Sequence, residues 1–149
     1  THTSHMCKGY HKNVTEPDEN YKFPIKHTGA CEHILYSSLV HPIQFDKKVL
    51  ISASGYMFPC YDDGVYGVTQ HCLYIIVHDK CEGESIVSML SRKLYRYYIA
   101  NLKTCGFTDK KLISRLPKLN CAKNWTDEEL YKHFELTDEE IALIESTIK

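Results

Sequence analysis

The sequence lacks any apolar run of the roughly 18 residues that a membrane helix requires, and no pattern of a secretory signal peptide opens it. These absences predict a protein of the cytoplasm with no membrane partner. The first five residues, Thr1 to His5, precede Met6 in a Ser-His-Met pattern that is typical of a cloning remnant. We expect residues 6–149 to form one domain, because a chain of this length buries one good core.

The sequence also lacks the common catalytic motifs, since no P-loop, G-x-G-x-x-G, H-E-x-x-H or G-x-S-x-G pattern occurs. Activation of Cys72 by His71 is disfavoured, because adjacent strand residues point to opposite faces of a sheet. Asp62 and Asp63 are expected in a turn. We therefore predict no catalytic residue, metal or cofactor in this chain. A Cys-dependent hydrolase or a small nuclease is the enzymatic alternative.

The seven cysteines include no C-x-x-C pair, and an odd number cannot complete a disulfide framework. Reduced, mostly buried thiols are the better interpretation. Cys7 with His11, or Cys31 with His33, could be half of a metal site, but neither pair has a partner pair at zinc-finger spacing.

The net charge of −1 conceals two segments of opposite charge. Residues 88–123 contain nine basic residues and one acid, Asp109, for a local charge of +8. Residues 124–149 contain eight acids and two lysines, for a local charge of −6. Soluble surfaces usually mix the two signs, and binding a polyanion would remove the self-repulsion of the basic segment. Two interpretations of this segment stay open, an ordinary solvated surface and a nucleic-acid contact.

Hydrophobic patterning predicts an α+β fold with a small central β-sheet, a long amphipathic helix and a C-terminal helical part. Residues 48–54 and 72–79 are apolar runs bounded by turn residues, which indicates two buried strands. A short strand is expected between them at 56–61. Further extended pieces are expected around 21–24 and 34–39.

Beyond Glu82 the apolar period changes from two to 3.6, which predicts one helix that continues to about Lys103. Its predicted packing face contains Ile86, Leu90, Leu94, Tyr97, Tyr98 and Asn101. At about 100° per residue, the opposite face presents three cations, Arg92, Arg96 and Lys103.

The C-terminal part shows three helix signals. A short helix over 109–116 should stop at Pro117, which cannot continue it. Two Thr-x-x-Glu capping boxes, at 126–129 and 137–140, should begin the last two helices. The acids that follow each threonine suit the helix dipole, so the acidic charge of this part needs no partner.

An aromatic loop, GYMFPCYDDGVYGVTQ at residues 55–70, lies between the two central strands. Its Asp-Asp-Gly and Tyr-Gly steps favour tight turns. Of Tyr56, Phe58 and Tyr61, which alternate as strand residues do, at least two are expected in the core. Core packing and nucleic-acid contact are both open for the residue types that can stack on a base or hydrogen-bond its edge: Tyr61, Tyr66, Gln70 and His71.

Four segments in order carry a resemblance to a known family: KVLISASGYMFPCYDDGVYGVTQHCLYIIV, GESIVSMLSRKLYRYYIANLKTCGF, LPKLN and WTDEELYKHFELTDEEIALIE. Their order and spacing resemble the C-terminal target recognition region of adenine-specific DNA methyltransferases from restriction-modification systems, including those of phages and large DNA viruses. The match covers about residues 48–145. Where the family pattern has Asn-Ser-Lys-Leu, this chain has Ser-Arg-Lys-Leu at 91–94.

The resemblance implies DNA recognition without chemistry. In such enzymes a preceding catalytic domain carries an Asn-Pro-Pro-Tyr type motif and a pocket for S-adenosylmethionine, and neither occurs in this sequence. The chain would then be part of a larger methyltransferase or fused restriction-modification enzyme, in the cytoplasm of its own cell or of a virus-infected host. It would bind double-stranded DNA and help present an extruded adenine to the catalytic domain.

The DNA-contacting residues are expected in the aromatic loop and in the basic segment. Gln70 suits a bidentate contact with adenine, and the cations would hold phosphates. The full set is Tyr61, Tyr66, Thr69, Gln70, His71, Arg92, Lys93, Arg96, Lys103, Lys110 and Lys111. The alternative function is a protein–protein interaction module that uses the tyrosine-rich loop and the acidic C-terminal helices.

Overall fold

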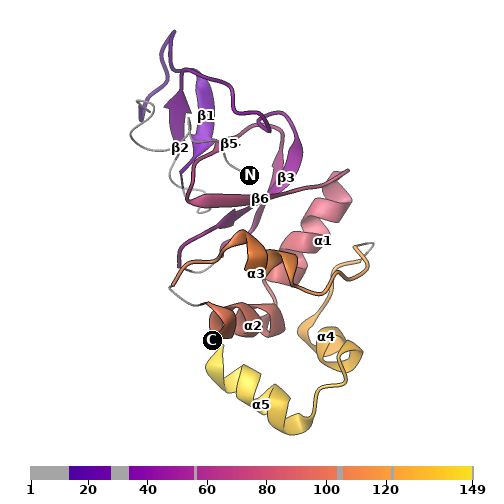
Figure 1. The fold of residues 1–149 in the computed structure, drawn as a ribbon. Helices are drawn as coiled ribbons and strands as arrows, with labels where there is room; N and C mark the ends of the chain where they lie inside the picture. The colour runs from indigo at the N-terminus through magenta and orange to yellow at the C-terminus, as the bar shows by residue number, and fades with distance from the viewer. Residues whose placement is uncertain (1–13, 28–33, 56, 104–105, 122, 149) are drawn as a thin grey trace.

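A computed structural model describes residues 14–27, 34–55, 57–103, 106–121 and 123–148. The cloning remnant, Tyr56 and the pairs Cys7 with His11 and Cys31 with His33 lie outside these residues. The fold is α+β, as the sequence predicts, with the strands gathered at one end of the molecule and the helices at the other (Figure 1). The strands are β1 (Phe23–Lys26), β2 (Ile34–Ser37), β3 (Lys47–Ser52), β4 (Cys60–Asp63), β5 (Gly67–Val68) and β6 (Cys72–Ile76). The helices are α1 (Lys80–Leu90), α2 (Lys93–Leu102), α3 (Lys110–Ser114), α4 (Asp127–His133) and α5 (Asp138–Thr147).

The central sheet has the order β4-β3-β6, and both pairings are antiparallel. β3 is the middle strand, and five of its six residues are buried, which explains its continuous apolar pattern. Val49 of β3 pairs with Tyr61 of β4 on one side and with Ile75 of β6 on the other. The two predicted central strands are therefore confirmed as neighbours.

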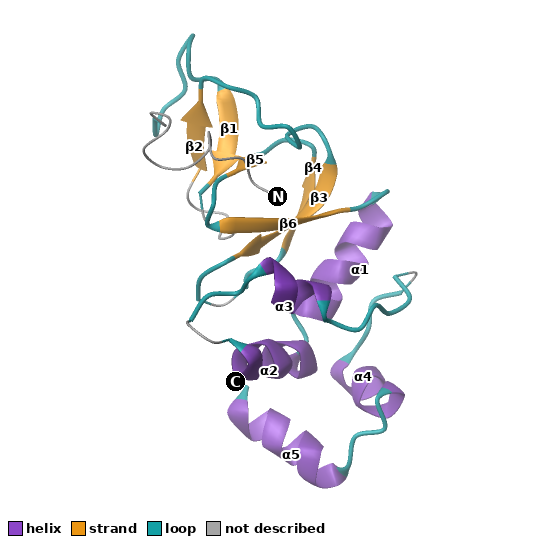
Figure 2. Ribbon diagram, in the orientation of Figure 1, coloured by secondary structure: helices purple, strands orange, loops and turns teal. Residues whose placement is uncertain are grey.

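A second sheet has the order β2-β1-β5 and packs beside the first (Figure 2). β1 is antiparallel to β2 and parallel to β5. The extended pieces predicted around 21–24 and 34–39 are thus confirmed as strands. Because β4 and β5 both lie within the aromatic loop, the loop joins the two sheets.

The long helix predicted from Glu82 to about Lys103 is wrong in one respect, because the structure divides it into α1 and α2. The break falls at Arg92, whose extended backbone has a ψ of 151°. The carboxylate of Asp127 in α4 accepts a hydrogen bond from the amide of Lys93 at 2.8 Å and so holds the start of α2. A contact from another helix, which no local pattern reveals, therefore sets the break.

The break also changes which residues of α2 pack inward. Tyr95 and Ile99 are buried, whereas Tyr98 and Asn101 of the predicted packing face are exposed. In α1 the predicted inward residues Ile86 and Leu90 are buried. The periodicity is correct within α1 and shifts by about one residue in α2.

The helical part lies below the central sheet in the view of Figure 1. α1 packs on β3 and β4, and α2 packs on α4 and α5. Both predicted capping boxes are present, with each threonine accepting from the amide of the glutamate three residues on. Among the described residues, no helix combines the length and the apolar character needed to cross a bilayer.

Phe58 of the aromatic loop and Cys81 are more exposed than the sequence predicts. Phe58 is 56 % exposed and Met57 is buried, so the core takes the residue beside the phenylalanine. Tyr61 is half-buried. The described cysteines are all free thiols, as expected, but of these only Cys72 is buried and Cys81 is exposed.

Candidate nucleic-acid interface

Three chain segments meet where β3 ends at Ser52. The amide of Ala53 donates to the carbonyl of His71 at 3.0 Å, and the amide of Thr108 donates to the carbonyl of Ala53 at 2.7 Å. Ser54 also forms a β-bridge with Phe107. These backbone bonds hold the turn before β6 and the segment before α3 on either side of the chain that follows β3.

The C-terminal end of α2 joins this junction. The ammonium of Lys103 donates to the carbonyl of Gly55 at 2.5 Å, which ties the helix end to the turn after β3. A groove of about 320 Å³ opens here, lined by Gly55, Met57, Arg96, Ile99, Ala100, Lys103, Gly106 and Ile148. The two cations lie seven residues apart, so two helical turns place them on one face of α2.

Two glycines make the walls of this groove open. Gly55 has a φ of +66° and Gly106 a φ of +74°, a conformation that favours glycine. No heavy atom lies within 4 Å of the position that a Cβ would occupy at either residue. Among the described residues that line the groove there is no Asp or Glu, and its two cations would attract a phosphate group.

The turn predicted to contact bases lies at the same junction. Gln70 and His71 are half-buried, with the Nε2 of Gln70 at 3.2 Å from the Nε2 of His71. The His71 ring packs edge-on against the ring of His27, with centroids 5.1 Å apart. Thr69 is fully buried, and its hydroxyl donates to the carbonyl of His27 at 2.9 Å. Thr69 therefore anchors the turn, and Gln70 and His71 form its outer part.

The structure does not bring Tyr61 and Tyr66 to this junction. The Tyr61 ring lies against Gly83 of α1, and its hydroxyl donates to Asp63 at 2.8 Å. The pKa of Tyr61 is raised to about 12, mainly by desolvation and to a smaller extent by the hydrogen bond to Asp63. Tyr66 lies beneath the ammonium of Lys26, 4.5 Å from the ring centroid. Both tyrosines are held by neighbours within the protein.

Arg92 and Lys93 lie at the opposite end of α2, about 15 Å from Lys103 at 1.5 Å per residue. Arg92 donates to the hydroxyl of Ser88 at 3.1 Å. Lys93 forms an ion pair with Glu145 of α5. The three cations predicted on one helix face therefore do not form one cluster, because Arg92 lies at the far end of α2 from Lys103 and donates to Ser88 of α1.

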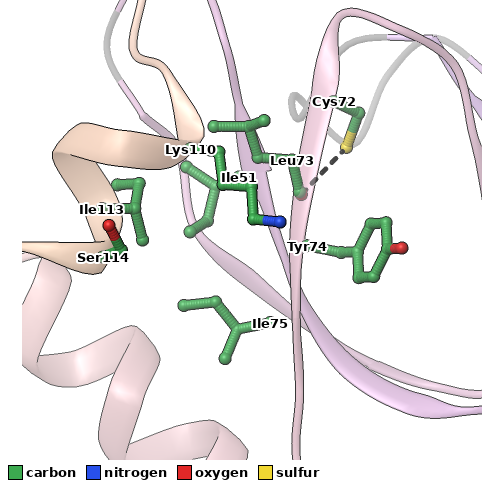
Figure 3. A pocket seen from close by; sticks show the side chains of 8 residues that line it. All are labelled: Ile51, Cys72, Leu73, Tyr74, Ile75, Lys110, Ile113 and Ser114. Atoms are coloured by element: carbon green, nitrogen blue, oxygen red, sulfur yellow. Dashed lines mark hydrogen bonds between the residues drawn. The ribbon is translucent and has the colours of Figure 1, made fainter. Parts of the chain in front are cut away.

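Lys110 and Lys111 begin α3, which packs near β6. Figure 3 shows Lys110 extending from α3 into a pocket of about 440 Å³ whose other lining residues are Ile51, Cys72, Leu73, Tyr74, Ile75, Ile113 and Ser114. This pocket is largely apolar. Lys111 is exposed. Neither lysine is among the described residues that line the groove.

Phe58 and Phe107 were not predicted as site residues, although each adjoins a residue of the groove. Both are 56 % exposed. No local signal indicated Phe107, since Gly106 lies beyond the C-cap of α2 at Lys103 and does not mark an exposed ring.

The structure also bears on the chemistry of the site. Among the described residues, no group of three or more His, Cys, Asp or Glu side chains could hold a metal ion. Burial raises the pKa of the Cys72 thiol to about 12, so it stays protonated at neutral pH and is a poor nucleophile.

Searches of family models, curated proteins and solved structures found no match to this chain.

Proposed function

We propose that this chain binds double-stranded DNA through the groove between α2 and the turn after β3. Arg96 and Lys103 hold backbone phosphates, and Gln70 and His71 contact base edges. The observation that carries this proposal is the meeting of two cations and two open glycines in a groove whose described lining residues include no Asp or Glu.

The junction suits this division of work. Backbone hydrogen bonds connect His71 to Ala53 and Ala53 to Thr108, and Lys103 is bonded to Gly55. The base-contacting turn is thereby held at a set position relative to the phosphate-binding cations. Such pre-organisation limits the entropy that is lost when the complex forms.

The family resemblance narrows the proposed role to the target recognition domain of an adenine-specific DNA methyltransferase. In that role the chain selects the DNA sequence. A catalytic domain elsewhere in the parent protein supplies S-adenosylmethionine and transfers the methyl group. The segments that carry the resemblance include the turn after β3 and helix α2, and residues of both line the groove.

Fluorescence anisotropy with a labelled DNA duplex tests the proposal. The variant R96Q/K103Q should bind at least tenfold more weakly than the wild-type protein, because two phosphate contacts are lost. The matched control is K80Q/K132Q, which removes the same charge from exposed lysines of α1 and α4. The control should bind within about twofold of wild type, because neither Lys80 nor Lys132 lines the groove.

Equal weakening in both variants would show that binding follows net charge and not the groove. A wild-type protein that binds no duplex would contradict the function itself. Thermal unfolding of both variants provides the check that each is folded.

A further inference from the structure

The pocket between helix α3 and the edge strand β6 has no role in the proposed DNA contact (Figure 3). Its volume of about 440 Å³ lies within the range of pockets that hold small organic ligands. None of its described lining residues also lines the cationic groove. The pocket is therefore a separate candidate site.

The pocket is apolar at its inner end and cationic at its mouth. Ile51 and Cys72 are fully buried, so they form the inner end. Lys110 and Ser114 of α3 are exposed and mark the mouth. The side chain of Lys110 extends from α3 into the pocket (Figure 3). A ligand here would bury an apolar end and keep a charged end beside the ammonium of Lys110.

The ammonium of Lys110 determines the charge of the ligand. None of the ion pairs between described residues includes Lys110, and the described lining residues include no Asp or Glu. A carboxylate at the mouth would gain a charge-assisted hydrogen bond from the lysine. An amino group would find no counter-charge among these residues, and several hydroxyl groups would be buried against apolar walls. The chemistry favours a monocarboxylate with an apolar body.

A second pocket adjoins the first and extends the apolar space toward α1. Its volume is about 270 Å³, and its lining shares Ile75, Ile113 and Ser114 with the first pocket. Ile86 and Leu90 of α1 also line it, and both belong to the hydrophobic core. The two pockets together make an elongated apolar path, which fits an alkyl chain better than a compact ring system.

We propose that the pocket between β6 and α3 binds a fatty acid, a monocarboxylate with an unbranched alkyl chain. The carboxylate pairs with the ammonium of Lys110, and the chain lies against Ile75 and Ile113 and reaches toward α1. This site does not depend on the proposed DNA binding. It gives a ligand-binding role to Lys110, which does not line the cationic groove.

Titration with decanoate below its micellar concentration tests the proposal, with the isoleucine δ1 methyl groups labelled for NMR. The signals of Ile51, Ile75 and Ile113 should shift, because these residues line the pocket. The signals of Ile99 and Ile148, which line the cationic groove, should stay in place. Affinity should rise up to about fourfold per methylene from hexanoate to dodecanoate, because each methylene buries more apolar surface. Unmoved pocket methyl signals would refute the proposal.

The variant K110M keeps an apolar stem and removes the ammonium. It should bind decanoate about tenfold more weakly than wild type, because a charge-assisted hydrogen bond is lost. It should bind decanol, which carries no charge, with wild-type affinity. The matched control is K111M, because Lys111 is the exposed neighbour in α3 and does not line the pocket. Unchanged decanoate affinity in K110M, or equal losses in K110M and K111M, would refute the pairing.

A second lysine, Lys118, lines the adjoining pocket and tests the orientation of the chain. If K118M loses decanoate affinity and K110M keeps it, the carboxylate lies at the other end of the path and the assignment to Lys110 is wrong. R96Q/K103Q should bind decanoate as wild type does, because neither residue lines this pocket. A failure of fatty-acid binding is thus distinguishable from a failure of DNA binding.

Discussion

The ammonium of Lys48 and the carboxylate of Asp62 form a buried ion pair, with 2.5 Å between Nζ and Oδ2 and side chains 0 % and 3 % exposed. Lys48 also donates to the carbonyls of Gln44 and Asp46, at 3.0 and 2.9 Å. Asp62 accepts from the amide of Val65 at 3.2 Å. The pair thus fastens the tight turn of the aromatic loop to the central strand β3.

Removing one partner of this pair should be strongly destabilising. Asp62→Asn would leave the Lys48 ammonium buried without a counter-charge, at a cost of about 3–5 kcal/mol in the free energy of unfolding. Urea titration followed by circular dichroism measures this cost. In K48M/D62N the buried charge is gone, so the double variant should lose less stability than the two single variants added together. Additive losses would contradict a direct interaction between the two side chains.

The contact between Gly83 and Tyr61 predicts the effect of a small substitution. A Cβ at Gly83 would lie 2.3 Å from the Cδ2 of Tyr61. We expect Gly83→Ala to cost up to about 3 kcal/mol by overpacking, more than the gain of about 1 kcal/mol from helix propensity. In a Tyr61→Ala background the ring is removed and with it the clash, so the same change should stabilise α1. Thermal unfolding of the four proteins decides between these outcomes.

The bond network around Glu145 predicts a pH dependence. Its carboxylate accepts from the Lys93 ammonium and, at 2.7 Å, from the Tyr131 hydroxyl. These bonds hold the pKa of Glu145 below its ordinary value of 4.5. A lowered carboxyl pKa stabilises the folded state above the unfolded value, and the stabilisation is lost as the pH falls through the folded value.

Denaturant titrations of wild type and Glu145→Gln across acidic pH test this assignment. The stability difference between the two proteins should be complete above pH 4.5 and should shrink as the pH falls below it. A difference that stays constant over this range would show that the carboxylate charge contributes nothing.

Gln70 should affect sequence preference and not overall affinity. A glutamine amide can contact one adenine in a bidentate manner, and such a pair contributes about 1–3 kcal/mol of discrimination. Selection of bound duplexes from a randomised pool, followed by sequencing, should give a less defined motif for Gln70→Ala than for wild type. Affinity for the unselected pool should be unchanged. A fall in pool affinity with an unchanged motif would assign Gln70 to the phosphate backbone instead.

Local signals in the sequence predicted much of the fold. The strands at β3 and β6 follow from apolar runs, and the starts of α4 and α5 follow from their capping boxes. The break before α2 was not predictable, because it depends on Asp127, a residue 34 positions further along the chain. Contacts between distant segments leave no periodic pattern in either partner.

The candidate site shows the same limit. Arg96, Lys103, Gln70 and His71 were predicted, and backbone hydrogen bonds bring their segments to one junction. Lys93 was predicted with them, but it pairs with Glu145. Charge counting cannot distinguish a cation that lines a groove from one that meets an acid of another helix. Phe107 was missed because composition alone does not indicate which aromatic rings remain exposed.

The salt dependence of DNA binding tests the central claim most directly. Each phosphate contact releases counterions, so the slope of log affinity against log salt is about −0.9 per contact. R96Q/K103Q should therefore have a slope shallower than wild type by about 1.8, whereas K80Q/K132Q should have the wild-type slope. Wild-type binding that does not change with salt, or one slope shared by all three proteins, would contradict phosphate recognition by Arg96 and Lys103.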